Sequence, residues 1–244
     1  MESATAKLLR DLADRYETTA FLKDDPSRIM HSVTDRLNRE AAAFVASSLS
    51  FGSRSQFLPK IESILSLAHN NVDQWIRSRQ ALKDFSPDDR SNFYRFFTRA
   101  DMHNFFRMYS DILTNYGSLG EYIAPRCNGD AFVAVKLICD AFRGCGIIPK
   151  DSSSCCKRVC MFLRWMVRTD SPVDLGLWSR FIDRRTLIIP MDVHVQKEAS
   201  KLGLMQIKST SMSAARRLTS IVAEVFPDDP LKADFALFGL GITR

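Results

Sequence analysis

Apolar residues recur at helical spacing along most of this 244-residue chain. Leu8, Leu9, Leu12 and Tyr16 fall on one face of a helix expected over residues 5–22. The same period predicts further helices over 40–49, 54–68, 131–142, 213–226 and 230–238, the last one ended by Gly239. The chain has only 10 Gly and 9 Pro, so it is poor in the residues that punctuate strands and hairpins. The pattern therefore predicts an all-α fold.

An aromatic segment follows a strong helix-start pattern at residues 86–89. Ser86 supplies a capping hydroxyl, Pro87 suits a first helical position, and Asp88 and Asp89 complement the helix dipole. The helix opened there is expected to hold four aromatic residues, Phe93, Tyr94, Phe96 and Phe97. Such a cluster could stack on a nucleic-acid base, but aromatic residues at helical spacing more often form core, and core is the expectation.

The stretch 152–203 carries the arrangement most suggestive of chemistry. Lys157 begins an apolar helix-like run, which places its amine in a first turn with unpaired backbone N–H groups. Asp192 ends the extended segment 187–190 and begins a second helix that Gly203 is expected to stop. An aspartate in that position is typical of a helix N-cap, whose carboxylate accepts backbone N–H bonds. Lys157 and Asp192 are therefore the candidate catalytic residues.

Positive charge is concentrated in the same stretch. The chain has a formal charge of +6, and residues 152–203 hold nine Lys and Arg against five Asp and Glu. This surplus is where a polyanion would bind, and the candidates for phosphate contact are Arg164, Arg168, Arg184 and Arg185. The alternative, a solvated helix face with a chance surplus, is equally compatible with the charge alone.

The six cysteines and the amino-terminal residues bear on the compartment. The first sixteen residues are charged and amphipathic rather than apolar, which predicts no signal peptide, reduced thiols and a cytoplasmic protein. No apolar run is long enough to span a bilayer, so no membrane partner is expected. The cysteine spacing matches no zinc pattern, and no metal or other cofactor is expected.

The segment IPMDVHVQKEASKLGL resembles, nearly position by position, the segment around the catalytic aspartate of the helix-hairpin-helix DNA glycosylase superfamily. The strings FLRWMVR and DFALFGLG are also similar to an uncharacterised bacterial family that we place among its distant relatives. The spacing from Lys157 to Asp192 is closer to the archaeal 8-oxoguanine glycosylase branch than to the endonuclease III branch. The resemblance implies base excision of oxidised purines from damaged duplex DNA by a monomeric bacterial protein located with the nucleoid.

The resemblance also implies an architecture and further site residues. Two helical subdomains, 35–168 and 1–34 with 169–244, would leave a cleft between them lined by Lys157 and Asp192. Lys157 would attack the sugar, form a Schiff base and allow strand cutting, while Asp192 would balance the positive charge on the sugar. Further nucleic-acid contacts would come from Arg54, Ser153, Ser154, Arg158 and His194, and base-pocket or gap-filling contacts from Phe51 and Trp178. For Phe51, a place in the core is an equal alternative.

The chain departs from the family at the hairpin before the lysine. The family usually has Leu-Pro-Gly-Val-Gly there, whereas this chain has Ser152, Ser153, Ser154, Cys155 and Cys156. No glycine is present to supply a left-handed turn, although serines can bond phosphates through hydroxyl and backbone groups. Two other interpretations stay open: a non-catalytic DNA-binding relative, and a structural helical module in which Lys157 and Asp192 are not neighbours.

Overall fold

The computed structural model describes residues 2–206 and 209–242, most of them in helices. In the described residues, no helix has the combination of length and apolar character needed to cross a membrane. The chain divides into two compact units: unit 1 comprises Met1–Lys23, Asn128–Val135 and Ser152–Arg244, and unit 2 comprises Asp24–Cys127 and Lys136–Asp151. The expected all-α character is therefore confirmed, apart from one small sheet.

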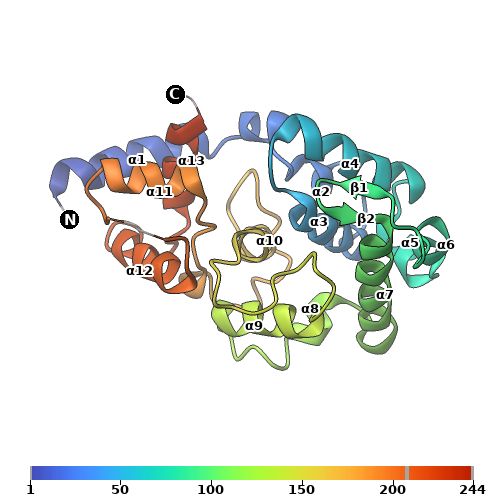
Figure 1. Ribbon diagram of the computed structural model, residues 1–244. Helices are drawn as coiled ribbons and strands as arrows, with labels where there is room; N and C mark the ends of the chain where they lie inside the picture. Colours follow the sequence, from blue (N-terminus) through green and yellow to red (C-terminus); the bar gives the residue numbers. More distant parts are fainter. Residues whose placement is uncertain (1, 207–208, 243–244) are drawn as a thin grey trace. The chain divides into compact units, whose positions relative to one another are not determined.

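Unit 1 is built around a carboxy-terminal helix. Its elements are α1 (Ser3–Tyr16), most of the 3₁₀ helix η1 (Thr19–Asp24), the start of α9 (Ala131–Ala141), α10 (Lys157–Val167), the 3₁₀ helix η2 (Arg184–Thr186), α11 (Val193–Lys201), α12 (Met212–Ala223) and α13 (Lys232–Ile242). Helix α13 packs against both α1 and α11 (Figure 1). Residues 231, 233 and 235–237 of this segment are buried.

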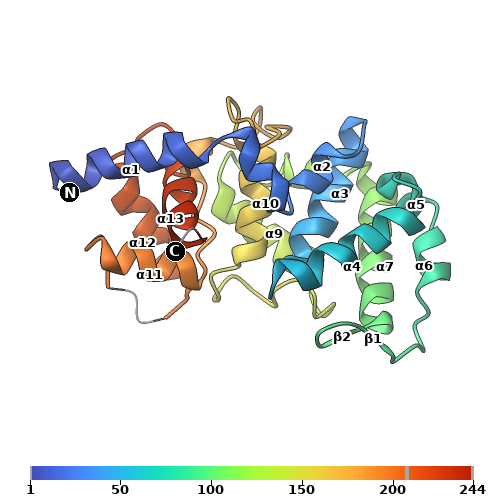
Figure 2. The same cartoon turned by 90° about the horizontal axis from the view of Figure 1, so that it is seen from above.

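Unit 2 surrounds an aromatic core. Its helices are α2 (Arg28–His31), α3 (Arg36–Leu49), α4 (Arg54–Leu67), α5 (Val72–Arg77), α6 (Gln80–Asp84), α7 (Arg99–Tyr116), α8 (Leu119–Ile123) and the end of α9. Phe44 of α3 packs against Phe105 and Tyr109 of α7 and against Phe142, with ring centroids 5.0–5.7 Å apart. Helices α3 and α7 thus share one buried seam (Figure 2).

Residues 86–98 do not form the predicted helix. They make a turn and an antiparallel hairpin of β1 (Asn92–Tyr94) and β2 (Phe97–Thr98). Arg95 takes a left-handed φ of 52° at the tip, and Phe93, Tyr94 and Phe97 are buried. Helix α7 begins only afterwards, at a capping box in which Thr98 and Asp101 each bond the other's backbone N–H. The later capping signal therefore sets the helix start.

The compact units have different boundaries from the subdomains that the resemblance implies. Residues 24–34 belong to unit 2, and residues 152–168 belong to unit 1 together with Asp192. Lys157 and Asp192 accordingly lie in the same unit rather than in two. A unit defined by contacts is not the same as an independently folding domain, so the predicted division itself stays a prediction.

Helix α10 is buried beyond its first turn, and this changes the role of Arg164 within the helix and of Arg168 at its C-cap. Residues 159–167 are all buried, and the side chains of Arg164 and Arg168 are only 5% and 1% exposed. A helix apolar around its whole circumference belongs in a core, where any charge must be paired. The prediction that Arg164 and Arg168 contact phosphate is therefore corrected: in this structure they are core residues.

Four carboxylates neutralise these arginines. Arg164 donates from Nε to Asp174 at 3.2 Å and from Nη1 to Asp234. Arg168 pairs with Asp174, with Asp229 at 2.8 Å and with Glu17 at 2.7 Å. Burial alone would lower the pKa of Arg168, but Asp174, Asp229 and Glu17 outweigh it and hold that pKa above its usual value. We call this set of six residues the arginine network.

Gly239 does not end the last helix, which continues to Ile242. A Cβ at this position would overlap the ring of Tyr16, including its Cγ atom. The missing side chain therefore lets α1 and α13 approach closely. The prediction that Gly239 ends the helix is wrong. This glycine instead allows α13 to pack closely against Tyr16 of α1.

We expect Gly239→Ala to lower the free energy of unfolding. Overpacking costs about 1–3 kcal/mol, while alanine gains about 1 kcal/mol of helix propensity over glycine, so a net loss of up to about 2 kcal/mol should be seen in urea unfolding. In a Tyr16→Ala background the same change should be neutral or stabilising. Equal costs in both backgrounds would contradict the proposed overlap.

We expect Arg168→Gln to destabilise the protein by about 3–5 kcal/mol, because it leaves buried carboxylates without their cation. The matched control is Arg185→Gln, since the Arg185 side chain is 64% exposed. That change should alter stability by about 0.5 kcal/mol or less. Denaturant unfolding of both variants checks this, and similar small shifts for the two would mean that the arginine network is not a structural element.

Candidate active site

Lys157 and Asp192 meet at the starts of two helices of unit 1. Lys157 is the first residue of α10, and Asp192 is the N-cap of α11, as the sequence predicts. Lys157 Nζ lies 3.8 Å from Asp192 Oδ2, longer than a direct hydrogen bond. Their side chains are 27% and 22% exposed. The pair is therefore partly open to solvent.

The two carboxylate oxygens of Asp192 have different tasks. Oδ1 accepts the backbone N–H groups of His194 at 2.9 Å and Val195 at 3.0 Å, which caps α11. Oδ2 faces the amine of Lys157. Because capping occupies one oxygen, it fixes the carboxylate plane and leaves the other oxygen directed at the lysine. Helix capping and any chemistry at Asp192 are thus compatible.

The other end of α11 is closed as predicted. Gly203 has a left-handed φ of 68°. Its N–H bonds Ser200 at 3.1 Å, and the N–H of Leu204 bonds Ala199 at 3.0 Å, the two bonds of a Schellman motif. Helix α11 is therefore a short, firmly bounded element between Asp192 and Gly203.

The glycine-free turn before Lys157 is made by a cysteine. Cys156 has a left-handed φ of 45°, the conformation that glycine supplies at lower cost. Sulfur contacts surround it: Cys155 Sγ donates to Met191 O at 3.3 Å, and Cys160 Sγ donates to Cys155 O at 3.6 Å. The first of these bonds joins the turn directly to the residue before Asp192. Burial raises the pKa of the Cys155 thiol, so this group stays a neutral donor.

Asp234 of α13 is a site neighbour that sequence reasoning missed. It is buried and accepts a hydrogen bond from Arg164. Burial raises the pKa of Asp234, Arg164 opposes this, and Asp192 and Lys157 act on it with smaller and opposite effects. The arginine network thus reaches the charges of the candidate site. A lone Asp in an apolar helix, as here, is the only sequence signal for such a residue.

The remaining predicted contacts of unit 1 differ in accessibility. Ser153, Ser154 and the side chain of His194 are exposed, and Arg158 is half-buried on the first turn of α10. Arg184 pairs with Asp170 at 3.5 Å, and Arg185 with Asp183 at 2.7 Å. These residues keep accessible surface, so their predicted contacts with nucleic acid stay predictions.

Trp178 is not available to a base. Its ring is fully buried, with Phe162 edge-on at 5.1 Å and Phe181 at 5.5 Å. The backbone N–H of Trp178 bonds Met166 O at 2.6 Å, which folds this segment back on α10. The prediction of Trp178 as a base-pocket residue is therefore corrected, since it forms core.

Phe51 and Arg54 belong to unit 2. Phe51 is half-buried between the aromatic residues of the hairpin, with Tyr94 at 4.9 Å, Phe96 at 5.3 Å and Phe97 at 5.2 Å. Arg54 begins α4 and is half-buried. Phe96 is the exposed member of this cluster, at 69%. The structure brings neither Phe51 nor Arg54 into the unit that holds Lys157.

Within the described ranges, no group of three or more His, Cys, Asp and Glu residues is arranged to hold a metal ion. No curated protein and no solved structure was found to match the chain. The family described as "Protein of unknown function (DUF2400)" matches residues 25–243. Because this match takes in nearly the whole chain, the protein belongs to the DUF2400 family.

Proposed function

We propose that this protein is a DNA glycosylase that removes an oxidised purine from duplex DNA and, through Lys157, can also cut the strand. We propose with it a helix-hairpin-helix glycosylase-like fold. The observation that carries the proposal is the Lys157–Asp192 pair, with its 3.8 Å separation and its partial exposure. The two helix starts place an amine and a carboxylate close enough to act on the same carbon atom. Base excision with strand cutting needs such a pair, a nucleophile and an anion that stabilises the sugar cation.

The proposed reaction gives Lys157 the role of nucleophile and Asp192 the role of stabilising anion. The Lys157 amine first loses a proton to solvent by way of Asp192 Oδ2, which returns to its carboxylate form, and then attacks the anomeric carbon of the sugar. The glycosidic bond breaks, its electron pair leaves with the base, and the base takes up a proton. The Asp192 carboxylate stabilises the positive charge that develops on the sugar. The C1′–O4′ bond then breaks, O4′ takes up a proton, and the sugar ring opens to an imine between C1′ and the lysine nitrogen. Loss of a proton from C2′ of this imine allows elimination of the 3′ phosphate.

The cysteine-built turn supports this proposal against a non-catalytic relative. The absence of glycine does not prevent a left-handed residue before Lys157, because Cys156 adopts that conformation. A non-glycine residue held there costs about 1–3 kcal/mol, and such conformations persist where surrounding contacts enforce them. The bond from Cys155 to Met191 is one such contact, and it fixes the spacing of the two helix starts.

We expect the unaltered protein to be trapped covalently by borohydride on a duplex with a single 8-oxoguanine, because reduction of a Schiff base leaves a stable amine. Lys157→Gln should abolish trapping. Lys197→Gln is the matched control, since Lys197 is an exposed lysine of α11 and should leave trapping unchanged. Trapping of the Lys157→Gln protein would identify another nucleophile. Failure of the unaltered protein to process any lesion in a defined panel would favour the non-catalytic or structural interpretation.

We expect Asp192→Asn to slow base release by about 10²–10³-fold in single-turnover assays, because an amide cannot balance the sugar cation. Asparagine is a good N-cap, so the free energy of unfolding should change by about 1 kcal/mol or less. Asp35→Asn is the control, because Asp35 caps α3 in unit 2 by the same kind of bond. A wild-type rate of base release in Asp192→Asn would remove this aspartate from the mechanism.

A further inference from the structure

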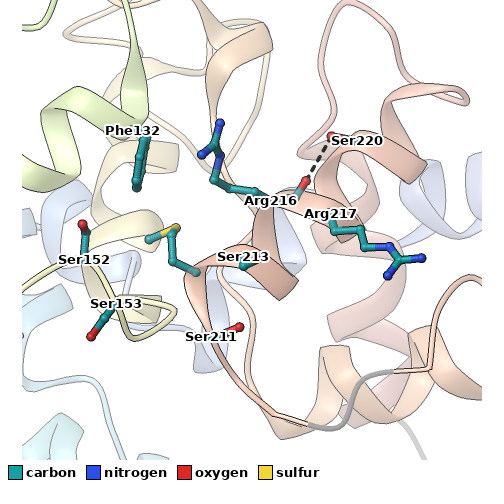
Figure 3. Close-up of a pocket in the computed structure, with 9 residues that line it drawn as sticks. Phe132, Ser152, Ser153, Ser211, Ser213, Arg216, Arg217 and Ser220 are labelled. Carbon is teal, nitrogen blue, oxygen red and sulfur yellow. Dashed lines mark hydrogen bonds between the residues drawn. The ribbon is translucent and has the colours of Figure 1, made fainter.

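A second candidate site lies on unit 1, in a pocket of about 480 Å³ beside the amino-terminal end of α12 (Figure 3). Five serines, two arginines, one phenylalanine and one methionine line it, and no acidic residue does. Its polar side chains are thus cations or hydroxyls, which suits an anion. The site proposed above does not use this pocket.

Arg216 is oriented by an aromatic ring. Its guanidinium lies over the face of Phe132, 4.6 Å from the ring centroid, and the two side chains point toward each other in Figure 3. Stacking fixes the plane of a guanidinium while leaving its N–H edge free to donate two parallel bonds. Arg217, the next residue, points away from Phe132.

Arg216 differs in its partners from the four arginines of unit 1 that the sequence predicts to contact phosphate. Arg164, Arg168, Arg184 and Arg185 each pair with a carboxylate. Among the residues that the structure describes, Arg216 has no carboxylate within ion-pair distance and contacts the Phe132 ring instead. A fixed guanidinium with no acidic partner can accept an external anion without first breaking an ion pair.

The walls of the pocket are held by backbone bonds. Ser154 and Ser211 form an isolated antiparallel bridge, and Met212 N–H bonds Ser153 O at 3.2 Å. Ser220 Oγ donates to Arg216 O at 3.1 Å, the bond drawn in Figure 3. The first two of these contacts join residues 153–154 to the start of α12, so the two sides of the pocket keep their spacing without a ligand.

Two hydroxyl groups add to the guanidinium. Within residues 2–206 and 209–242, the side chains of Ser152 and Ser213 make no hydrogen bond, and both line the pocket. A planar guanidinium with free hydroxyl donors matches the several acceptor oxygens of a phosphate group.

We infer that this pocket binds a phosphate group, with Arg216 as its principal ligand and Ser152 as a hydroxyl donor. The phosphate can come from the backbone of a nucleic acid or from a free phosphate ion, and the chemistry of the pocket is the same for both. A strand phosphate bound here would contact the segment that continues directly into Lys157. The inference concerns binding and does not require a reaction at Lys157.

The test compares Arg216→Gln with Arg217→Gln in the full chain. Both variants remove one positive charge from adjacent positions of α12, and only Arg216 stacks on Phe132. Binding of a lesion-free duplex is measured by fluorescence anisotropy across a salt series. We expect Arg216→Gln to weaken binding about tenfold and to reduce the salt slope by about one, and Arg217→Gln to weaken it less than about threefold. Equal losses would overturn the inference, since they would indicate diffuse surface charge.

A second arm uses inorganic phosphate alone, measured by its effect on thermal unfolding. Stabilisation that Arg216→Gln removes and Arg217→Gln keeps would support a site for free phosphate. An Arg216-specific loss confined to duplex binding would assign the phosphate to a nucleic-acid backbone. If neither arm separates the two variants, the pocket is not a phosphate site.

Ser152→Ala provides a variant that removes only a hydroxyl and serves if Arg216→Gln does not fold. Ser152→Ala should weaken binding a few-fold in whichever assay, duplex or inorganic phosphate, responds to Arg216. Unchanged binding in both assays would contradict the inference. The outcome is separable from that of the proposed glycosylase. If binding depends on Arg216 but borohydride trapping fails, the phosphate pocket is supported and the glycosylase proposal is rejected. If trapping succeeds but the Arg216 and Arg217 variants bind equally, the glycosylase proposal is supported and the phosphate pocket is rejected.

Discussion

The arginine network is the interaction on which the rest of unit 1 depends. Arg164 lies in the buried part of α10 and Arg168 at its C-cap. Their carboxylate partners come from the end of α1, the loop after α10, the segment before α13, and α13 itself. Buried charges of this kind are stable only when every partner is in place, so the network specifies one arrangement of these segments. Unit 1 has many aliphatic contacts that could be repacked, whereas these charge pairs could not.

The arginine network also helps to position the candidate site. Asp234 belongs both to the network, through Arg164, and to the surroundings of Lys157 and Asp192. The sulfur contact from Cys155 to Met191 O joins the two helix starts at a second point. Lys157 begins the helix that carries Arg164, and Asp192 caps a helix that packs against α13, so the amine and the carboxylate need little ordering when a ligand arrives.

The sequence predicted local features well and burial poorly. Lys157 as a helix start, Asp192 as an N-cap and Gly203 as a helix stop each depend on a few adjacent residues, and each is confirmed. For Arg164 and Trp178 the sequence predicts contact with a ligand, because their burial depends on how the following segment folds back on α10, which residue spacing does not show. The run FLRWMVR was itself informative, since arginines in a helix apolar on every face should be expected in ion pairs. The hairpin at 92–98 was missed because its helix-start signal was followed by a stronger one at Thr98.

The position of α13 has a consequence for how the chain assembles. Helices α1 and α13 pack against each other although they lie at opposite ends of the described sequence, and unit 2 occupies most of the chain between them. Contacts so far apart in sequence close large loops and form slowly. During synthesis, the residues of unit 2 are complete while α1 still lacks its partner, so the face of α1 that packs on α13 stays uncovered until α13 has been made. Unit 1 therefore completes its helix contacts only after every residue of unit 2 is present.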